Sequence, residues 1–210
     1  MSGDYRVTEY CPEFDNILTK KAGLVEMIRK KHPRRRDLHC LISPNDSEYK
    51  IPFMEVYNCK CSYCGVSIDI IPKDNFEIDH YIYKEDKEIF STAADAGYIE
   101  NLVLACRRCN HQKSSFAIED DFLEILHPDS DCIKTVFERS ESYDIVISKE
   151  YIKSPTIIAF YNQLKLGQEV HKFDYLLLKM MGQQKSATSS DKYRALGEAI
   201  SLLRQRRNMI

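Results

Sequence analysis

The amino-acid sequence predicts an α+β protein, with helices at both ends of the chain and a small cysteine-bound core that contains strands. Three observations indicate this class. Apolar residues recur at helical spacing over residues 16–31 and again after residue 154. Two CxxC pairs, at 61–64 and 106–109, enclose a segment whose alternation is typical of a strand. Two further alternating segments after this core predict a β-hairpin.

Composition limits the class of protein. The chain has 210 residues, of which 43% are hydrophobic and 30% charged, as in soluble globular proteins. No apolar run reaches the length of a membrane span, and the first residues lack the apolar region of a signal peptide. We therefore expect a cytoplasmic protein with no membrane partner. The net charge of -2 argues against a uniformly basic surface for nucleic acid, but it allows a local basic patch.

Residues 1–56 are expected to form a helical and basic extension. Apolar positions predict a helix over 16–31, whose other face is rich in lysine and arginine and leads into Arg34-Arg35-Arg36. Such a run is usually a solvated helix face, and the alternative is contact with phosphate groups. Turn-forming residues predict a loop at 41–50, and the apolar segment 51–57 predicts a short helix.

Residues 119–210 are expected to form a C-terminal hairpin and helical region. Ser154 is a candidate N-cap with Pro155 in the first helical turn, and Gly167 is a candidate C-cap of the same helix. The expected elements are a short helix at 120–126, strands at 135–139 and 144–148, helices from 155, at 171–181 and at 191–206, and a polar linker at 182–190.

The cysteine spacing predicts a structural metal site. In a reducing compartment, paired CxxC motifs favour metal binding over disulfides. Each CxxC turn presents two thiolates on one side of the backbone, so Cys61, Cys64, Cys106 and Cys109 would complete a tetrahedral Zn²⁺ site with no open position. Cys59 offers a third thiol nearby. The spacing favours Cys61 and Cys64, and a part for Cys59 stays open.

A candidate catalytic pair lies between the two CxxC motifs in the sequence. The segment 76–82 alternates as a strand does, and it contains Asp79 and His80. Neighbouring side chains on a strand point to opposite faces, so the strand end or a turn would have to re-aim one of them for both to share a site. Asn101 and Asn110 follow, and they favour a functional role for the Asp-His pair over a buried structural histidine.

The pattern C-S-Y-C-G, D-H, N-L-V-L-A and C-R-R-C-N-H-Q-K resembles the HNH endonuclease family. The resemblance covers about Cys59 to Lys113, and it implies a ββα-metal core at 57–118. In that fold a hairpin and a helix hold one divalent cation at the phosphate that is cleaved. The implied activity is metal-dependent hydrolysis of phosphodiester bonds in DNA.

The same resemblance implies a role for each matching residue. Hard oxygen ligands favour Mg²⁺ or Mn²⁺, and a neutral imidazole suits a general base. His111 directly follows Asn110 and is an alternative metal ligand. The implied roles are metal ligation by Asp79 and Asn110, general base catalysis by His80, bracing of the loop by Asn101, and phosphate contact by Lys113.

The flanks resemble a narrower group. The segments E-V-Y-N-C-K-C-S-Y-C-G, L-H-P-D and Y-N-Q-L-K-L-G resemble stand-alone HNH nucleases of bacterial antiphage defence, of the Septu type. This resemblance implies an antiviral effector subunit that works with an ATPase partner, with the helical flanks as docking surfaces. The alternatives are a catalytically silent zinc module that binds nucleic acid or protein, and an HNH nuclease that acts on RNA or only nicks DNA.

Overall fold

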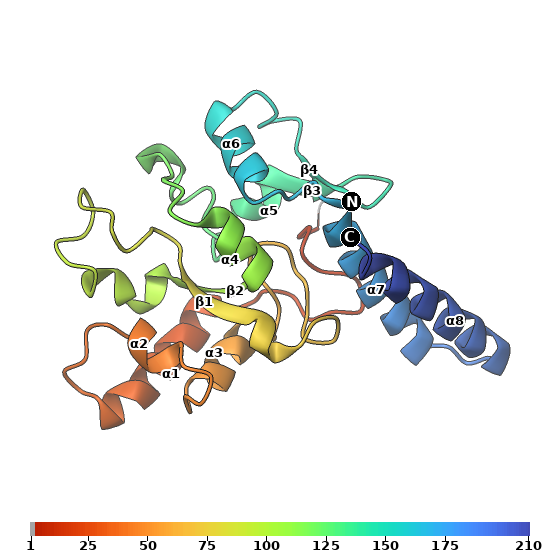
Figure 1. The fold of residues 1–210 in the computed structure, drawn as a ribbon, viewed down its shortest axis with the longest axis horizontal. Helices are drawn as coiled ribbons and strands as arrows, with labels where there is room; N and C mark the ends of the chain where they lie inside the picture. The colour runs from red at the N-terminus through yellow and green to blue at the C-terminus, as the bar shows by residue number, and fades with distance from the viewer. Residues whose placement is uncertain (1–2) are drawn as a thin grey trace.

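The computed structural model describes residues 3–210, in which helices surround a short antiparallel hairpin (Figure 1). Its strands pair from Phe76 opposite Cys106 to His80 opposite Leu102, and every residue of the second strand is buried. The helix that follows begins directly after Cys106, so two strands and a helix form one ββα unit. Its elements are β1 (Phe76–His80), β2 (Leu102–Cys106) and α4 (Arg107–Lys113). The predicted α+β class is confirmed.

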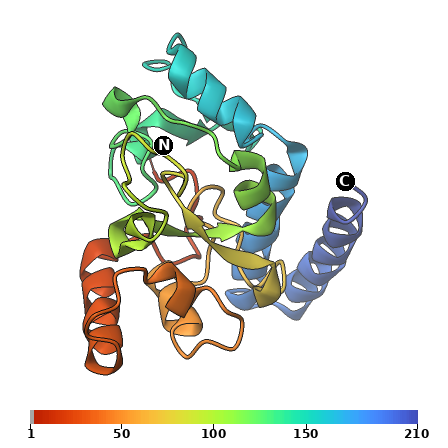
Figure 2. The same ribbon diagram turned by 60° about the vertical axis from the view of Figure 1, so that its left-hand side comes forward.

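The N-terminal region packs on the side of the hairpin opposite α4 (Figures 1 and 2). The apolar stripe of α1 buries Ile17, Leu24 and Ile28, in keeping with its helical spacing. The region contains α1 (Ile17–Lys31), α2 (His39–Ile42) and α3 (Lys50–Val56). The predicted helices at 16–31 and 51–57 are therefore confirmed, and α2 is an additional short helix at the start of the predicted loop.

The C-terminal region supplies a second hairpin and three longer helices, of which α7 and α8 pack together at one end of the molecule (Figures 1 and 2). The hairpin and the N-cap are as predicted, because the Ser154 hydroxyl accepts a hydrogen bond from the Ile157 amide. The elements are α5 (Ile133–Val136), β3 (Phe137–Arg139), β4 (Ile145–Ile147), α6 (Pro155–Gln163), α7 (Glu169–Lys185) and α8 (Ser190–Arg207).

Three local predictions in the C-terminal region are wrong. Helix α6 ends at Gln163, and Lys165 rather than Gly167 adopts the left-handed conformation, with a φ of 51°. The predicted linker at 182–190 is confined to residues 186–189, because α7 continues through Gly182 to Lys185 and α8 begins at Ser190. A Cβ at Gly182 would lie 2.2 Å from Tyr10, so this glycine serves close packing and not a break. The predicted helix at 120–126 is only a 3₁₀ turn at Asp120–Phe122.

The N-terminal residues, for which the sequence predicts no structure, pack against the first CxxC turn. Arg6 is only 2% exposed, forms an ion pair with Asp4 at 2.7 Å, and donates to the Ser62 and Pro128 carbonyls at 2.7 Å each. Gly65, at φ 81°, lets the first CxxC turn meet this segment, since a Cβ there would lie 2.1 Å from the Arg6 carbonyl oxygen. One continuous hydrophobic core includes residues from the extension, the hairpin unit and the C-terminal region.

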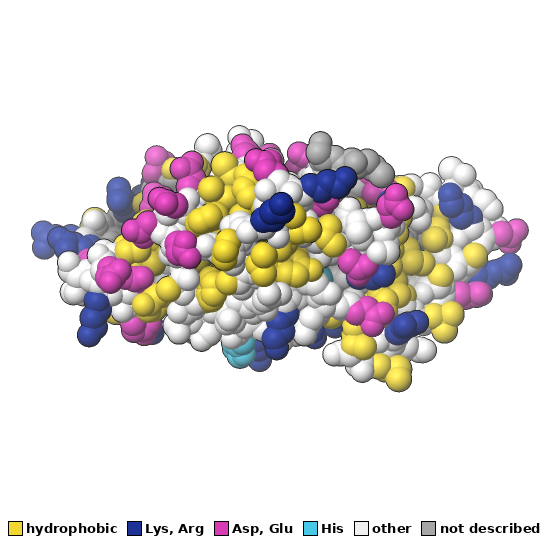
Figure 3. All heavy atoms as spheres, turned by 90° about the horizontal axis from the view of Figure 1, so that it is seen from above, with side chains coloured by type: hydrophobic (Ala, Val, Ile, Leu, Met, Phe, Trp, Pro, Cys, Tyr) yellow, Lys and Arg dark blue, Asp and Glu magenta, His cyan; other side chains and the backbone are white. Residues whose placement is uncertain are grey.

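The molecular surface mixes charge types. Figure 3 shows lysine, arginine, aspartate and glutamate side chains interspersed over one face, around a stretch of hydrophobic side chains. This distribution agrees with the small net charge of -2. Within residues 3–210, none of the helices combines the length and the apolar character that a membrane crossing requires.

Candidate active site

The four paired cysteines converge on one buried point. The sulfur atoms of Cys61, Cys64, Cys106 and Cys109 all lie within 4.8 Å of one another. The first pair sits in a tight turn, where the Gly65 amide donates to the Cys61 carbonyl at 2.9 Å. The second pair spans the end of β2 and the first turn of α4. Four buried thiolates at this spacing fit a tetrahedral metal ion such as zinc.

The two CxxC motifs thus connect the strand hairpin to α4, and they position the residues between them. Cys59 is partly exposed and lies outside the group of four sulfur atoms. Cys61 and Cys64 share the CxxC spacing of Cys106 and Cys109, whereas Cys59 does not, and the geometry agrees with the assignment favoured by this spacing.

Asp79 and His80 lie at the end of β1 and line one hollow of about 330 Å³, together with Asn110. We call this the active-site hollow. β1 ends at His80, and the chain then bends so that the Tyr81 amide donates to the Asn101 carbonyl at 2.8 Å. Because the strand stops here, the two neighbouring side chains reach the same hollow although one is buried and the other is half-exposed.

The Asp79 carboxylate forms the buried floor of the hollow and is 6% exposed. One of its oxygens accepts a hydrogen bond from the Tyr63 hydroxyl at 2.7 Å, and the other accepts one from the Lys113 ammonium at 3.2 Å. Burial raises the pKa of Asp79, whereas the Lys113 charge acts in the opposite direction. Tyr63, from the first zinc turn, is thus a residue of the site that the motif pattern did not single out.

His80 stacks on a second imidazole, that of His39. The two ring centroids are 4.3 Å apart at an angle of 35°. His39 Nε2 lies 3.0 Å from the Ile78 carbonyl oxygen, and because a carbonyl only accepts, His39 carries its proton at Nε2. Burial, and then the neighbouring His39, lower the pKa of His80 to about 4. His80 is therefore neutral at pH 7 and able to accept a proton.

His39 comes from α2, far from the motif in sequence, and the sequence predicts no role for it. It stands in an unremarkable H-C-L-I segment after the arginine run, so only the tertiary contact identifies it. This contact depends on the close packing of residues 37–38 against Gly97, which we call the seam. There the Leu38 amide donates to the Gly97 carbonyl at 2.8 Å. A Cβ on Gly97 would lie 2.2 Å from Asp37 Oδ1, so the seam requires glycine.

Asn101 is buried and fastens the loop that follows β1. Its amide group donates to the Ile82 and Ala96 carbonyls at 3.0 and 2.9 Å, and its Oδ1 accepts from the Ile82 amide at 2.8 Å. All the hydrogen-bonding groups of this side chain therefore point at the backbone on both sides of the loop, and Asn101 does not line the active-site hollow.

Asn110 is oriented by Glu77, which the sequence analysis did not single out. Its Nδ2 donates to Glu77 Oε2 at 2.6 Å, which leaves its own Oδ1 as the oxygen available to a cation. Glu77 also accepts from Arg107 Nε at 3.0 Å. Although burial alone would raise it, the pKa of Glu77 is lowered by these donors. Glu77 precedes Asp79 by two residues, so the strand period could have indicated it.

The two other predicted residues of α4 lie elsewhere. The His111 side chain is 67% exposed, with its Nε2 3.6 Å from Glu77, and it does not line the hollow. Lys113 is fully buried, and its ammonium donates to the His80 carbonyl at 2.8 Å as well as to Asp79. This placement differs from the expected phosphate contact, because the Lys113 charge faces the end of β1 and not the surface.

Comparison with known protein families identifies the central unit. Residues 61–116 match the family model described as HNH, HNH endonuclease. The chain carries an HNH endonuclease domain. Such a domain implies phosphodiester hydrolysis, so the predicted HNH domain and enzyme class are confirmed, whereas the Septu-type relationship is a proposal. His39 lies outside the matched segment. No curated protein and no solved structure gave a significant match to the chain.

The HNH domain implies a divalent cation, and the residues at the active-site hollow fit one. Asp79 and Asn110 bring a carboxylate and an amide oxygen to the same hollow. Within residues 3–210, the four cysteines are the one group of three or more close His, Cys, Asp or Glu ligands. The cation would thus have few protein ligands and retain water, which is typical of Mg²⁺ and Mn²⁺.

Proposed function

We propose that this protein is a metal-dependent endonuclease that hydrolyses phosphodiester bonds of DNA at the active-site hollow. The observation that carries the proposal is the placement of His80, with a pKa of about 4, beside the buried Asp79 carboxylate within an HNH domain. A neutral imidazole next to an oxygen-lined cation site is the combination that hydrolysis of a phosphodiester requires.

Each residue then has a distinct task. His80 takes a proton from the attacking water, and His39 and the Ile78 carbonyl fix the plane in which its ring lies. Asp79 and Asn110 would hold Mg²⁺ or Mn²⁺, which supplies neutralisation of charge on the phosphate when it is bound. Tyr63 keeps the Asp79 carboxylate in place.

Asn101 and the zinc cluster support the site from outside. Asn101 holds the loop after His80 through backbone hydrogen bonds, so its loss would displace the imidazole without removing a reacting group. A zinc ion on the four cysteines would fix α4, and hence Asn110, against the hairpin. Both contributions are positional.

The proposal is tested by cleavage assays on duplex DNA, single-stranded DNA and RNA with Mg²⁺ or Mn²⁺. We expect His80→Ala to reduce cleavage at least about 100-fold, the usual contribution of a general base, with unchanged zinc content and unfolding midpoint. His111→Ala should retain activity and Asn110→Ala should lose it. Full activity in the His80→Ala protein would refute the proposal, and the reverse pattern at 110 and 111 would transfer the ligand to His111.

The substrate panel also separates the alternatives. Cleavage of RNA alone, or of one DNA strand, would replace duplex cleavage as the activity. Binding without any cleavage would favour the catalytically silent module.

A role as the effector subunit of an antiphage defence system, with an ATPase partner, is a further proposal. It rests on the resemblance of the flanking segments to Septu-type proteins. Co-purification with an ATPase encoded beside this gene, and cleavage that depends on that partner, would support it. Equal cleavage with and without the partner would contradict it.

A further inference from the structure

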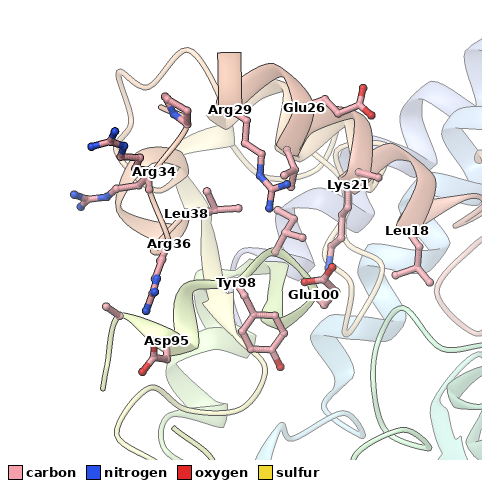
Figure 4. A pocket seen from close by; sticks show the side chains of 16 residues that line it. Leu18, Lys21, Glu26, Arg29, Arg34, Arg36, Leu38, Asp95, Tyr98 and Glu100 are labelled. Carbon is pink, nitrogen blue, oxygen red and sulfur yellow. The ribbon is translucent and has the colours of Figure 1, made fainter. Parts of the chain in front are cut away.

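A hollow of about 950 Å³, larger than the active-site hollow, is lined in part by the N-terminal extension (Figure 4). Helix α1 forms one wall, segment 33–38 a second, and segment 94–100 a third. We call it the arginine groove. Two of its walls belong to the N-terminal extension and lie outside the segment that matches the HNH family, so the extension builds a feature that the HNH motif does not include.

Three arginines of this groove have side chains without a hydrogen-bond or ion-pair partner among the described residues. Arg29, Arg34 and Arg36 are exposed, and none of them forms a hydrogen bond through its side chain or an ion pair with any residue that the structure describes. In Figure 4, Arg29 reaches toward the hollow from α1, Arg36 points toward Asp95, and Arg34 lies at the outer edge with its side chain directed away from Leu38 and Lys21. Arg35 differs from them, because its guanidinium donates to the Cys40 sulfur at 2.7 Å.

The groove also contains carboxylates, and their positions determine whether they neutralise the arginines. Glu26 and Glu100 lie on the side away from Arg34 and Arg36 (Figure 4). Asp95 lies near Arg36, and its carboxylate already accepts two hydrogen bonds from Thr92, at 2.9 and 2.8 Å.

The remaining cation of the groove, Lys21, is buried and paired with Asp129 at 2.5 Å, so it is not available to a ligand. The positive charge that is free to bind therefore collects at the end formed by segment 33–38.

That end of the groove meets the active-site hollow at two consecutive residues of the chain. Leu38 lines the arginine groove, and the next residue, His39, lines the active-site hollow and stacks on His80. The hydrogen bond from the Leu38 amide to the Gly97 carbonyl joins two of the groove walls at this seam. The groove and the active-site hollow are therefore lined by adjacent residues, Leu38 and His39.

We propose that the arginine groove binds a single strand of nucleic acid next to the bond that is cleaved. This inference rests on the proposed nuclease function and names the substrate form that it uses. The arginines contact phosphates, and the ring of Tyr98, 38% exposed on the opposite wall, stacks on an unpaired base. A cationic groove with an aromatic platform is the arrangement that binds unpaired strands, whereas a duplex is read by an element that enters its groove.

Binding is measured by fluorescence anisotropy with a labelled single-stranded oligonucleotide and with a labelled hairpin duplex. All proteins carry His80→Ala, so that the probe stays intact. The test protein adds Arg29→Ala, Arg34→Ala and Arg36→Ala. The matched control removes the same charge from exposed lysines outside the groove, by Lys149→Ala, Lys153→Ala and Lys192→Ala.

We expect the arginine variant to bind the single strand at least about tenfold more weakly, and the slope of log K against log salt to fall by about 2 for three lost phosphate contacts. The control should stay within about twofold. Tyr98→Ala should weaken single-strand binding by about fivefold or more and leave duplex binding unchanged. Equal losses in the arginine variant and the control, or tighter binding of the duplex, would overturn the proposal.

If the proposal of single-strand binding in the groove is wrong, the experiments give a different result than if the nuclease proposal is wrong. With His80 intact, the arginine variant should raise KM for a single-stranded substrate and leave kcat unchanged. Cleavage with an unaltered KM would refute the groove alone. Oligonucleotide binding that depends on the arginines, in a protein that cleaves nothing, would refute the nuclease proposal alone.

Discussion

At the scale of single residues, His80, the proposed general base, is positioned by a side chain from outside the HNH motif. His39 and His80 stack at 4.3 Å, and the Ile78 carbonyl fixes the ring of His39. The strand and the motif therefore place His80 at the hollow, while its ring plane depends on α2. This arrangement makes the activity of the HNH unit sensitive to changes in the extension.

We expect His39→Ala to lower kcat about tenfold with little change in KM, because His80 loses its stacking partner but substrate contacts remain. Removal of His39 also exposes His80 and deletes a like charge, so the pKa of His80 rises from about 4 toward its ordinary value. The acid limb of the pH–rate profile should move to higher pH. An unshifted profile with normal kcat would contradict this role, and His32→Ala serves as the control.

Gly97 provides a test of the seam that carries His39. A Cβ at this position would lie 2.2 Å from Asp37 Oδ1 and 3.0 Å from the Asp37 Cα, so Gly97→Ala should cost about 1–3 kcal/mol in unfolding free energy and reduce cleavage. Gly23→Ala, in α1 with no atom within 4 Å, should instead stabilise the protein by about 0.5–1 kcal/mol. Urea unfolding and cleavage assays of both variants measure this difference.

At the scale of elements, the two CxxC turns link β1, β2 and α4 into one unit. We expect Cys106→Ser to lose the metal and to destabilise the ββα unit by several kcal/mol, since metal binding and folding are coupled. Cys59→Ser should keep both the metal and the stability, because Cys59 lies outside the group of four sulfur atoms. Metal analysis measures the metal content of both variants, and thermal unfolding measures their stability. A metal-free Cys106→Ser protein of normal stability would contradict the structural role of the cysteine cluster.

Local patterns were sufficient for most elements of the fold. Alternation predicted β1 and the β3–β4 hairpin, helical spacing predicted α1 and α8, and the Ser154-Pro155 pair marked the start of α6. The errors have a tertiary cause. Gly182 continues α7 because Tyr10 packs against it, and the left-handed Lys165 ends α6 without a glycine.

The candidate site was predictable to the same extent. Motif spacing indicated Asp79, His80 and Asn110, which the structure brings to one hollow. His39 was not predictable, because its contact arises when α2 packs against the end of β1. The burial of Lys113 likewise depends on how α4 lies on the hairpin, which residue order does not encode.

At the scale of the whole molecule, acid should weaken the fold through His171 on α7. This imidazole is 2% exposed, neither ring nitrogen has a partner among the described residues, and burial lowers its pKa to about 4. The folded state therefore binds fewer protons than the unfolded state between pH 4 and about 6.5, so stability is lost as pH falls through this range.

We expect a loss from this residue of about 2 kcal/mol between pH 7 and 5, which follows from the two pKa values. In urea unfolding, the free energy of unfolding of the His171→Gln protein should fall by about 2 kcal/mol less between pH 7 and 5 than that of the parent. His111→Gln, at an exposed histidine, should keep the parent dependence. Identical pH dependence in the parent and the His171→Gln protein would contradict the assignment.

The buried Arg6 has a consequence for the modularity of this nuclease. Its guanidinium donates to the carbonyls of Ser62, in the first CxxC turn, and of Pro128, so the first residues of the chain join the HNH unit to a segment that follows it. A fragment cut to residues 61–116 would retain every residue of the motif and lose this brace together with His39. We therefore expect a fragment of residues 61–116 to be less stable and less active than the full chain.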